Sequence, residues 1–402
     1  MPKVEVRNLY KIFGPSPKKI LPLLEQGKGK AEILKSTGHG VGVNNANFQV
    51  EEGEFFVVMG LSGSGKSTLI RCLNLLIRPT SGQVLIDGED ITKCKKEELL
   101  QIRRKKIAMV FQNFALLPHR TVESNVEFGL EIQGVAPEIR RKKASDALKM
   151  VGLEGHEDRM PSQLSGGMQQ RVGLARALAN DPDILLMDEA FSALDPLIRK
   201  EMQDELLALQ TKMHKTIIFI THDLDEALKL GDRIAIMKDG VIVQIGTPED
   251  ILTNPADDYV REFVQDVNRV KVVTAATIMR RPDPIAYARD GVRVAVRKMK
   301  EASISSIFVV DKEQHLKGIL SIDNAVALLK SGVHDPESIK NAVDTDVETV
   351  SPNASIEELL PLVINSKYPI VVVDEEQKVI GMIMKVSVLS GILGEEEVED
   401  ND

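Results

Sequence analysis

The sequence predicts an α/β domain that is built around a phosphate-binding loop and is followed by a smaller α+β module. Two observations carry this prediction. A glycine-rich loop at 60–68 lies between an apolar run at 55–59 and a segment with helical spacing that begins at Leu69, which is the strand, loop and helix context of such a loop. Nearer the C-terminus, the run 307–311 recurs 63 residues later as 370–374, which indicates an internal repeat.

The length and composition are those of a soluble globular protein with two or three domains. The 402 residues are 43% apolar and 28% charged. No apolar run approaches the roughly 18 residues that span a bilayer, and the first residues do not resemble a signal peptide. We therefore expect any work at a membrane to take place from the cytosolic side. The two cysteines are too few for a disulfide framework, which favours a reducing compartment.

The net charge of −9 is unevenly distributed along the chain. Six of the last eight residues are acidic, so we expect the tail 395–402 to be flexible. A short basic segment contains Lys93, Lys95, Lys96, Arg103, Arg104, Lys105 and Lys106. This segment is either a solvated helical face, which is the commoner outcome, or a patch that meets anionic lipid or polyphosphate.

The chain begins with an alternating pattern at 4–14 that predicts a strand ending in a glycine turn. Phe13 or Tyr10, in this stretch, lies against an adenine ring, or both belong to the core, which is the commoner place for an aromatic residue at a strand end. The stretch 15–42 is rich in proline, lysine and glycine and has the character of an insertion, with helical pieces at 20–26 and 30–35. Its role stays open. The runs 48–50 and 55–59 are expected to pair as strands around a turn.

The glycine-rich loop has the residue types that phosphate binding needs. Its glycines let successive backbone N–H groups turn inward, and the positive end of the following helix adds to the attraction for anions. Lys66 is expected to reach the β- and γ-phosphates, and the Ser67 hydroxyl to ligate Mg²⁺. The loop residues expected to bind nucleotide are Gly60, Ser62, Gly63, Gly65, Lys66, Ser67 and Thr68.

Several polar side chains follow apolar runs that are typical of buried strands. Gln112, the pair Asp188 and Glu189, and His222 each stand directly after such a run. The carboxyl ends of parallel strands meet at one edge of a sheet, where folds of this kind hold Mg²⁺ and position the attacking water. Asp188 is therefore the expected metal-side carboxylate, and Glu189 the one that acts on water.

A second anion-binding helix start is expected near residue 165. Ser165 stands where it can cap an amphipathic helix, and Gly166 and Gly167 expose N–H groups at the positive end of that helix. A helix cap alone does not need the Ser-Gly-Gly sequence.

These motifs occur in the order and spacing of the ATP-binding-cassette (ABC) ATPases, which the region 1–266 resembles. The Walker A loop, Q-loop, signature, Walker B, D-loop and H-loop of that family are all present. The resemblance implies a RecA-like core with an antiparallel β subdomain and a helical subdomain. It also implies a head-to-tail homodimer, with ATP held between the Walker A loop of one copy and Ser165, Gly166 and Gly167 of the other.

The same resemblance implies a role for each motif. Glu189 is the catalytic base, His222 orients the γ-phosphate and the water, and Gln112 couples the site to a membrane partner. Ser67, Gln112 and Asp188 are the expected Mg²⁺ residues. Phe13 matches the adenine-stacking aromatic, and Asp195 in the D-loop joins the nucleotide-binding set.

The C-terminal repeat resembles a tandem pair of CBS domains at 277–394, after a linker at 267–276. The copies cover about 277–330 and 338–394, and each is expected to run helix, strand, turn, strand, helix. Such modules commonly bind adenine nucleotides between their halves. The acidic residue that usually holds the ribose is replaced by Asn324 and Ser387. A cyclic dinucleotide such as c-di-AMP, or a purely structural pairing, therefore remains open.

Cassette, insertion and CBS pair together resemble the ATPase subunits of OpuA/ProV-type glycine betaine importers. This implies an integral membrane permease, an extracellular substrate-binding protein or domain, and a peripheral position on the cytoplasmic face of the membrane. An importer for choline, carnitine or proline is the alternative.

Two other classes of protein fit the sequence less well. A soluble cassette ATPase on ribosomes or DNA usually has a second phosphate loop or a coiled coil, and the sequence has neither, so no nucleic acid partner is expected. A degenerate ligand sensor would lack Lys66 or Glu189, and both are present.

Overall fold

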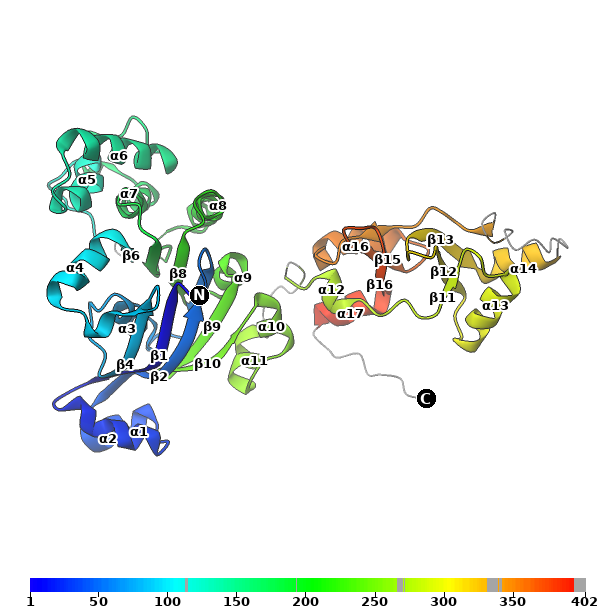
Figure 1. Ribbon diagram of the computed structural model, residues 1–402, viewed down its shortest axis with the longest axis horizontal. Coiled ribbons are helices and arrows are strands. Elements are labelled where there is room, and N and C mark those ends of the chain that lie inside the picture. Colours follow the sequence, from blue (N-terminus) through cyan, green and yellow to red (C-terminus); the bar gives the residue numbers. More distant parts are fainter. Residues whose placement is uncertain are drawn as a thin grey trace. The chain divides into compact units, whose positions relative to one another are not determined.

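The computed structural model describes residues 1–112, 115–192, 194–265, 270, 272–330, 339 and 342–393. The chain divides into two compact units, Met1–Gln265 and Asp266–Asp402, and each is described by itself (Figure 1). Residues 267–269 and 271 of the expected linker at 267–276, and the whole acidic tail at 395–402, lie outside the described residues. None of the described helices is long and apolar enough to cross a bilayer.

The centre of the first unit is a six-stranded sheet with the order β10-β9-β3-β8-β7-β6. Its strands are β3 (Phe55–Met59), β6 (Ile107–Phe111), β7 (Ile184–Asp188), β8 (Thr216–Thr221), β9 (Arg233–Lys238) and β10 (Val241–Gly246). All neighbours are parallel except β9 and β10. Every residue of β3, β7 and β8 is buried, as the continuous apolar runs predict for parallel strands covered on both faces.

A second, antiparallel sheet has the order β2-β1-β4-β5. Its strands are β1 (Val4–Phe13), β2 (Gly40–Val50), β4 (Ser81–Ile86) and β5 (Glu89–Asp90). The expected pairing of 48–50 with 55–59 is wrong, because β2 pairs with β1 whereas β3 pairs with β8 and β9. All side chains of β3 are apolar, and such a strand buries the most surface at the centre of a parallel sheet, between two neighbours. The turn at 51–54 therefore connects β2 of the antiparallel sheet to β3 of the six-stranded sheet.

The stretch between β1 and β2 forms both of the expected helical pieces. A 3₁₀ helix at Pro17–Ile20 continues into α1 (Leu21–Glu25), and α2 (Lys30–Thr37) follows. Ile20, Leu24 and Ile33 are buried in a cluster with residues of β1 and β2. The inserted segment therefore packs on the antiparallel sheet through its own small core.

The remaining α-helices of this unit either flank the sheets or pack on one another, and short 3₁₀ helices lie at Ile91–Lys93 and Pro161–Gln163. The α-helices are α3 (Lys66–Leu73), α4 (Lys96–Lys105), α5 (Val122–Ile132), α6 (Pro137–Met150), α7 (Gly166–Leu178), α8 (Pro196–Met213), α9 (Leu224–Leu230), α10 (Pro248–Thr253) and α11 (Asp258–Val264). Figure 1 shows α5, α6 and α7 grouped together, as a helical subdomain.

The basic segment at 93–106 is partly occupied by contacts within the fold. Lys93 pairs with Asp90 at 3.0 Å, and Lys106 pairs with Asp87 at 2.7 Å. The Arg103 Nε donates a hydrogen bond of 2.8 Å to the carbonyl oxygen of residue 74. Only part of this segment is therefore available to an anionic partner.

The second unit repeats one arrangement of helices and strands. The first copy contains α12 (Ala275–Ile278), β11 (Ile285–Tyr287), α13 (Val292–Glu301), β12 (Ser306–Val310), β13 (Leu316–Ser321) and α14 (Ile322–Lys330). The second contains β14 (Thr349–Val350), α16 (Ile356–Asn365), β15 (Ile370–Val373), β16 (Val379–Ile383) and α17 (Lys385–Leu393). The expected order of helix, strand, strand and helix is confirmed in both, and Phe308, Val310, Val371 and Val373 share one apolar cluster between the copies.

Candidate active site

A cavity of about 560 Å³ opens above the glycine-rich loop of the first unit. Its walls come from the loop, from the end of β1 and the start of β2, from α2, and from the residues after β6 and β7. The lining residues are Phe13, Lys30, Gly40, Val41, Gly42, Ser62, Gly63, Gly65, Lys66, Ser67, Thr68, Gln112 and Glu189. The cavity thus brings together seven of the residues expected to bind nucleotide with two of those expected to act on it.

The backbone of the loop can be built only with glycine at two of its positions. Gly60 has φ 146° and Gly65 has φ 110°. A Cβ would lie 2.2 Å from the Met237 carbonyl oxygen at Gly60, and 2.1 Å from the Gly42 carbonyl oxygen at Gly65. A side chain at either position would force neighbouring backbone apart, so the loop keeps its curve and its inward N–H groups only with glycine.

Lys66 is held across the base of this loop. Its side chain is 4% exposed, and Nζ donates hydrogen bonds to the carbonyl oxygens of Gly60 at 2.7 Å and Leu61 at 3.2 Å. Burial lowers the pKa of Lys66 below its usual range, because the charged form loses solvation there. An anion in the cavity would restore that solvation, which makes the ammonium group a strong phosphate ligand.

Ser67 and Asp188 form a pair of oxygen ligands beside Lys66. The Ser67 Oγ donates a hydrogen bond of 2.8 Å to the Asp188 Oδ1, and Arg71 Nη2 lies 3.2 Å from the other carboxylate oxygen. A hydroxyl and a carboxylate oxygen are the ligand types that Mg²⁺ prefers. These residues therefore fit a magnesium ion next to bound phosphates.

Glu189 follows β7 and lies among polar groups from three other segments. Its Oε1 is 3.8 Å from Lys66 Nζ, and its Oε2 is 3.5 Å from the His222 Nδ1 and 3.4 Å from the Gln112 Nε2. The backbone is left-handed at this residue, with φ 47°, a conformation that turns the chain sharply after the strand. Gln112 Nε2 also donates to Ser192 Oγ at 3.2 Å. The carboxylate is thus both exposed to the cavity and positioned by its neighbours.

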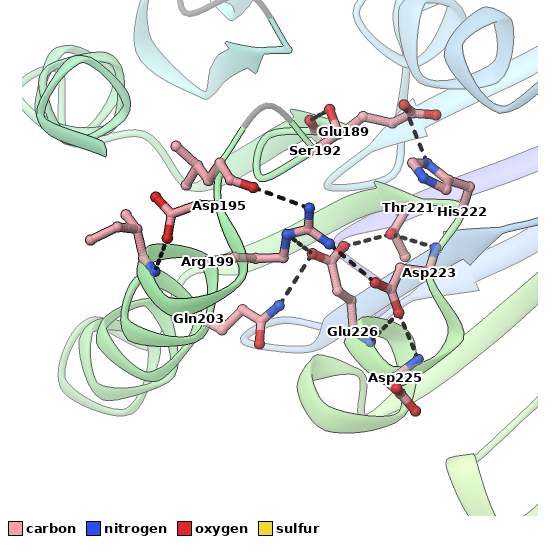
Figure 2. A network of polar contacts seen from close by, with 12 residues as sticks. Glu189, Ser192, Asp195, Arg199, Gln203, Thr221, His222, Asp223, Asp225 and Glu226 are labelled. Carbon is pink, nitrogen blue, oxygen red and sulfur yellow. Dashed lines mark hydrogen bonds and ion pairs between the residues drawn. The ribbon is translucent and has the colours of Figure 1, made fainter. Parts of the chain in front are cut away.

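Behind Glu189 and His222 lies a buried carboxylate that the sequence analysis missed (Figure 2). Glu226 of α9 is 5% exposed and accepts hydrogen bonds from Thr221 Oγ1 at 2.6 Å and Gln203 Nε2 at 3.2 Å. Burial raises the pKa of Glu226. A polar residue at a helical position that faces a core is the signal that could have pointed to it, but its partner Gln203 lies 23 residues away in the sequence.

Arg199 of α8 links this carboxylate to two loops. Its Nη2 donates to the Leu194 carbonyl oxygen at 3.2 Å, its Nη1 donates to the Asp223 Oδ2 at 3.4 Å, and its Nε lies 3.9 Å from the Glu226 Oε1. Figure 2 shows Arg199 with its contacts to Asp223 and Glu226. One guanidinium therefore ties the turn at 194–195 to the segment that carries His222.

Five predicted nucleotide-binding residues do not line the cavity of this chain: Gly60, at the start of the loop, and Ser165, Gly166, Gly167 and Asp195. Ser165 Oγ accepts a hydrogen bond from the Met168 N–H at the start of α7, and Asp195 caps α8 in the same way. Gly166 and Gly167 are the first two residues of α7. The helix start that was expected at Ser165 is present, and its residues do not contribute to the wall of this cavity.

Phe13 lies at the mouth of the cavity. Its side chain is 43% exposed, which is unusual for a large aromatic residue and favours the expectation of a ring that stacks on a ligand over one of a core residue. The Lys11 Nζ lies 4.9 Å from the centre of the ring. A Cβ at Gly42 would come within 2.8 Å of the same ring, so the glycine leaves the ring room to lie over the loop.

The two CBS positions without an acidic side chain have different surroundings. Asn324 is exposed, and its Nδ2 donates to the Ala342 carbonyl oxygen at 3.2 Å. Ser387 is 3% exposed, and its hydroxyl has no hydrogen-bond partner within the described parts of the chain. Cavities of about 180 and 380 Å³ lie in the second copy, the larger one along 349–353 and 373–377.

Comparisons with known proteins agree with this geometry. The family model described as "ABC transporter" matches residues 43–192, and the model "CBS domain" matches 275–331 and 339–394. Among solved structures, the ATP-binding cassette MJ0796 in a dimeric post-hydrolysis state bound to ADP and Pi is 36% identical. It aligns with a TM-score of 0.52 over 61% of this chain and 98% of its own.

Relatives of known function align along nearly the whole chain. The glycine betaine/carnitine transport ATP-binding protein GbuA of Listeria monocytogenes is 54% identical over 98% of this chain and 99% of its own length. The glycine betaine transport ATP-binding protein OpuAA of Bacillus subtilis is 55% identical over 98% and 93%. ProV of Salmonella typhimurium, a glycine betaine/proline betaine transport ATP-binding protein, is 51% identical over 97% of both chains. The chain therefore belongs to the family of ABC transporter ATP-binding subunits that includes the glycine betaine transport proteins.

Proposed function

We propose that this protein hydrolyses ATP to drive the import of glycine betaine or a related quaternary amine. The observation that carries the hydrolysis is the position of Glu189, whose carboxylate faces the cavity beside Lys66, Gln112 and His222. The names of GbuA, OpuAA and ProV support the solute. Relatives that include choline in their names are less similar, at 36–37% identity.

In this proposal the loop binds the nucleotide and the strand ends act on it. The N–H groups at 62–68 and Lys66 hold the phosphates, and Phe13 stacks on the adenine. Ser67 and Asp188, with Gln112 nearby, hold Mg²⁺, which neutralises phosphate charge.

Glu189 is the general base for the attacking water. Its Oε2 takes the proton as the water oxygen bonds to the γ-phosphorus and the bond between that phosphorus and the β–γ bridging oxygen breaks, so that ADP and phosphate leave. His222 Nδ1 holds the same carboxylate in place. Gln112 contacts both Glu189 and Ser192, so its position depends on whether nucleotide is bound, and it couples the site to the membrane permease.

A second copy of the chain supplies the remaining nucleotide contacts. Ser165, Gly166 and Gly167 stand at the positive end of α7, away from the cavity of their own chain, so the anion that they bind belongs to the other copy. The dimeric structure of MJ0796 supports this arrangement. We infer that Asp195, which caps the start of α8, belongs to the same interface.

The other partners follow from the role in transport. We propose an integral membrane permease, an extracellular substrate-binding protein or domain, and a peripheral position at the cytoplasmic face. Anionic lipid meets the part of the basic segment that internal pairs leave available, which includes Arg104 and Lys105. The CBS pair carries the regulation, with c-di-AMP as the candidate ligand at the second copy, where a loop cavity and the buried Ser387 lie.

The test is uptake by the assembled transporter in proteoliposomes. We expect radiolabelled glycine betaine to enter only when ATP is supplied to this subunit, and unlabelled carnitine, choline or proline to compete less well. ATP hydrolysis without any betaine uptake would contradict the proposed solute, whereas absence of hydrolysis would contradict the proposed activity itself.

A further inference from the structure

The inserted segment between β1 and β2 is a fixed part of the cavity wall. Ile20, Leu24 and Ile33 are buried against the antiparallel sheet. The segment is closed by His39, whose Nε2 lies 2.6 Å from the Pro15 carbonyl oxygen while Nδ1 lies 2.9 Å from the Thr37 carbonyl oxygen. Both ends of the insertion are therefore held together, and a side chain on α2 keeps a defined position relative to the loop.

Lys30 is the residue that this segment brings to the loop. Its Nζ donates a hydrogen bond of 2.7 Å to the Gly63 carbonyl oxygen, and its side chain lines the cavity together with Ser62, Lys66 and Glu189. An ammonium group has three N–H donors, so the bond to Gly63 leaves donors for a ligand. Lys30 and Lys66 are the cationic side chains among the lining residues.

Its position in the helix is unfavourable by local rules. Lys30 is the first residue of α2, at the positive end of the helix dipole, where a carboxylate stabilises and a cation does not. The residue before it, Gly29, offers no side-chain cap to compensate. A lysine at this point is therefore explained by what it meets in the tertiary structure rather than by the helix.

We propose that Lys30 is a second nucleotide-binding lysine, supplied by the insertion, which contacts the polyphosphate of ATP at the mouth of the cavity. This inference rests on the proposed function and adds to it a binding residue outside the common motifs. ATP carries several negative charges on its phosphates. Lys66 and the loop N–H groups contact these phosphates only from the side of the glycine-rich loop. Lys30 reaches them from the side of the insertion.

The experiment separates a charge contact with ATP from a simple tie between helix and loop. Lys30→Gln keeps an N–H donor for Gly63 but removes the charge, and Lys30→Arg keeps the charge. Lys35→Gln, on the same helix and not in the cavity wall, is the matched control. The full-length protein is titrated with ATP at low and at high salt, and KM and kcat for ATP are measured in the assembled transporter.

We expect Lys30→Gln to weaken ATP binding about three- to tenfold at low salt, as the loss of one partly exposed charged contact does. The effect should shrink at high salt because screening weakens the same contact in the wild type. KM should rise while kcat stays nearly constant, and Lys30→Arg and Lys35→Gln should match the wild type.

An ATP affinity of Lys30→Gln within about twofold of the wild type at low salt would overturn the inference, and Lys30 would then only tie α2 to the loop. Failure of the wild-type protein to bind ATP would overturn the proposed function as well, so the two failures are distinguishable. Thermal unfolding without nucleotide shows whether each variant is folded.

Discussion

Glu189 is the residue on which the proposed chemistry depends most directly. Replacing it with glutamine keeps the shape of the side chain but removes the proton acceptor, while the loop and the Ser67–Asp188 pair stay in place. We expect Glu189→Gln to bind ATP as the wild type does and to hydrolyse it at least about 100-fold more slowly.

Single-turnover hydrolysis and equilibrium ATP binding measure the two effects separately. Lys66→Ala is the comparison, because it removes a phosphate contact and should weaken binding itself. Hydrolysis by Glu189→Gln near the wild-type rate would remove this carboxylate from the mechanism.

Glu226 gives a prediction about pH. Its carboxyl faces Arg199 of α8 and Asp223 before α9, and burial raises its pKa above the usual value of 4.5. The unfolded chain keeps the usual pKa of 4.5 for this carboxyl. At pH values between 4.5 and the raised pKa of the folded protein, the folded state therefore binds more protons than the unfolded state. The stability contributed by the neutral carboxyl is therefore present below pH 4.5 and is lost as pH rises through the raised pKa.

Comparison with Glu226→Gln isolates this contribution, because the variant keeps every other titrating group. We expect the difference in free energy of unfolding between wild type and variant to shift in favour of the wild type as the pH falls from neutral toward 4.5. Urea denaturation of both proteins over this range measures it. A difference that is constant with pH would mean that Glu226 does not change its ionisation there.

At the scale of elements, Arg199 joins α8 to the segment before α9. Removing its guanidinium leaves the buried Glu226 without the nearby cation and frees the turn at Leu194 from the loop that carries His222. We expect Arg199→Ala to lower the free energy of unfolding by about 1–3 kcal/mol. We also expect kcat to fall with little change in KM for ATP, since Arg199 positions other residues and does not line the cavity.

The control is Lys200→Ala on the same helix, whose side chain is exposed. Denaturation curves and steady-state hydrolysis by the assembled transporter are measured for both variants. If Arg199→Ala loses stability but keeps the wild-type kcat, the contact only stabilises the fold and does not position the catalytic loops.

At the scale of the whole molecule, the first unit contains its own core and the whole cavity. The large apolar cluster and every residue around Glu189 lie within Met1–Gln265. We expect a chain truncated after Gln265 to fold and to bind ATP with a dissociation constant within about threefold of the full-length value.

Circular dichroism and ATP titration of the truncated chain test this expectation. We also expect c-di-AMP to bind the full-length protein and not to bind the truncated chain. A truncated chain that does not fold would show that the second unit stabilises the first.

The basic segment gives a prediction about the membrane. Arg103 and Lys106 bind groups of the fold, so the residues to reverse are Arg104 and Lys105. If they meet anionic headgroups, Arg104→Glu with Lys105→Glu should weaken the dependence of transport on anionic lipid, because each neutralised cation contributes about 1 kcal/mol near such a surface.

Transport in liposomes of increasing anionic lipid content measures this dependence. Lys18→Glu with Lys19→Glu, on the exposed face of the insertion, is the matched control. Equal lipid dependence in both double variants and the wild type would mean that the segment is only a solvated face.

The sequence by itself determined the parts of this protein that depend on local patterns. The glycines at 60, 63 and 65, the apolar run of β3 and the helical spacing after it specify the phosphate loop without reference to distant residues, because the curve of the loop is a backbone property. The repeat in the second unit could be predicted from local sequence patterns as well, because each copy forms its own sheet from segments that are neighbours in the sequence.

The tertiary structure alone decided which distant residues meet. The partner of a strand depends on which other strands of the chain can pair with it. β2 and β3 are adjacent in the sequence, but β2 pairs with β1 and β3 pairs with β8, so they belong to different sheets. Lys30 meets Gly63, and Arg199 meets Glu226, through contacts between elements that carry no local signal. Long polar side chains find such partners only when the packed core has fixed the distance between their elements, and that distance is a property of the whole chain.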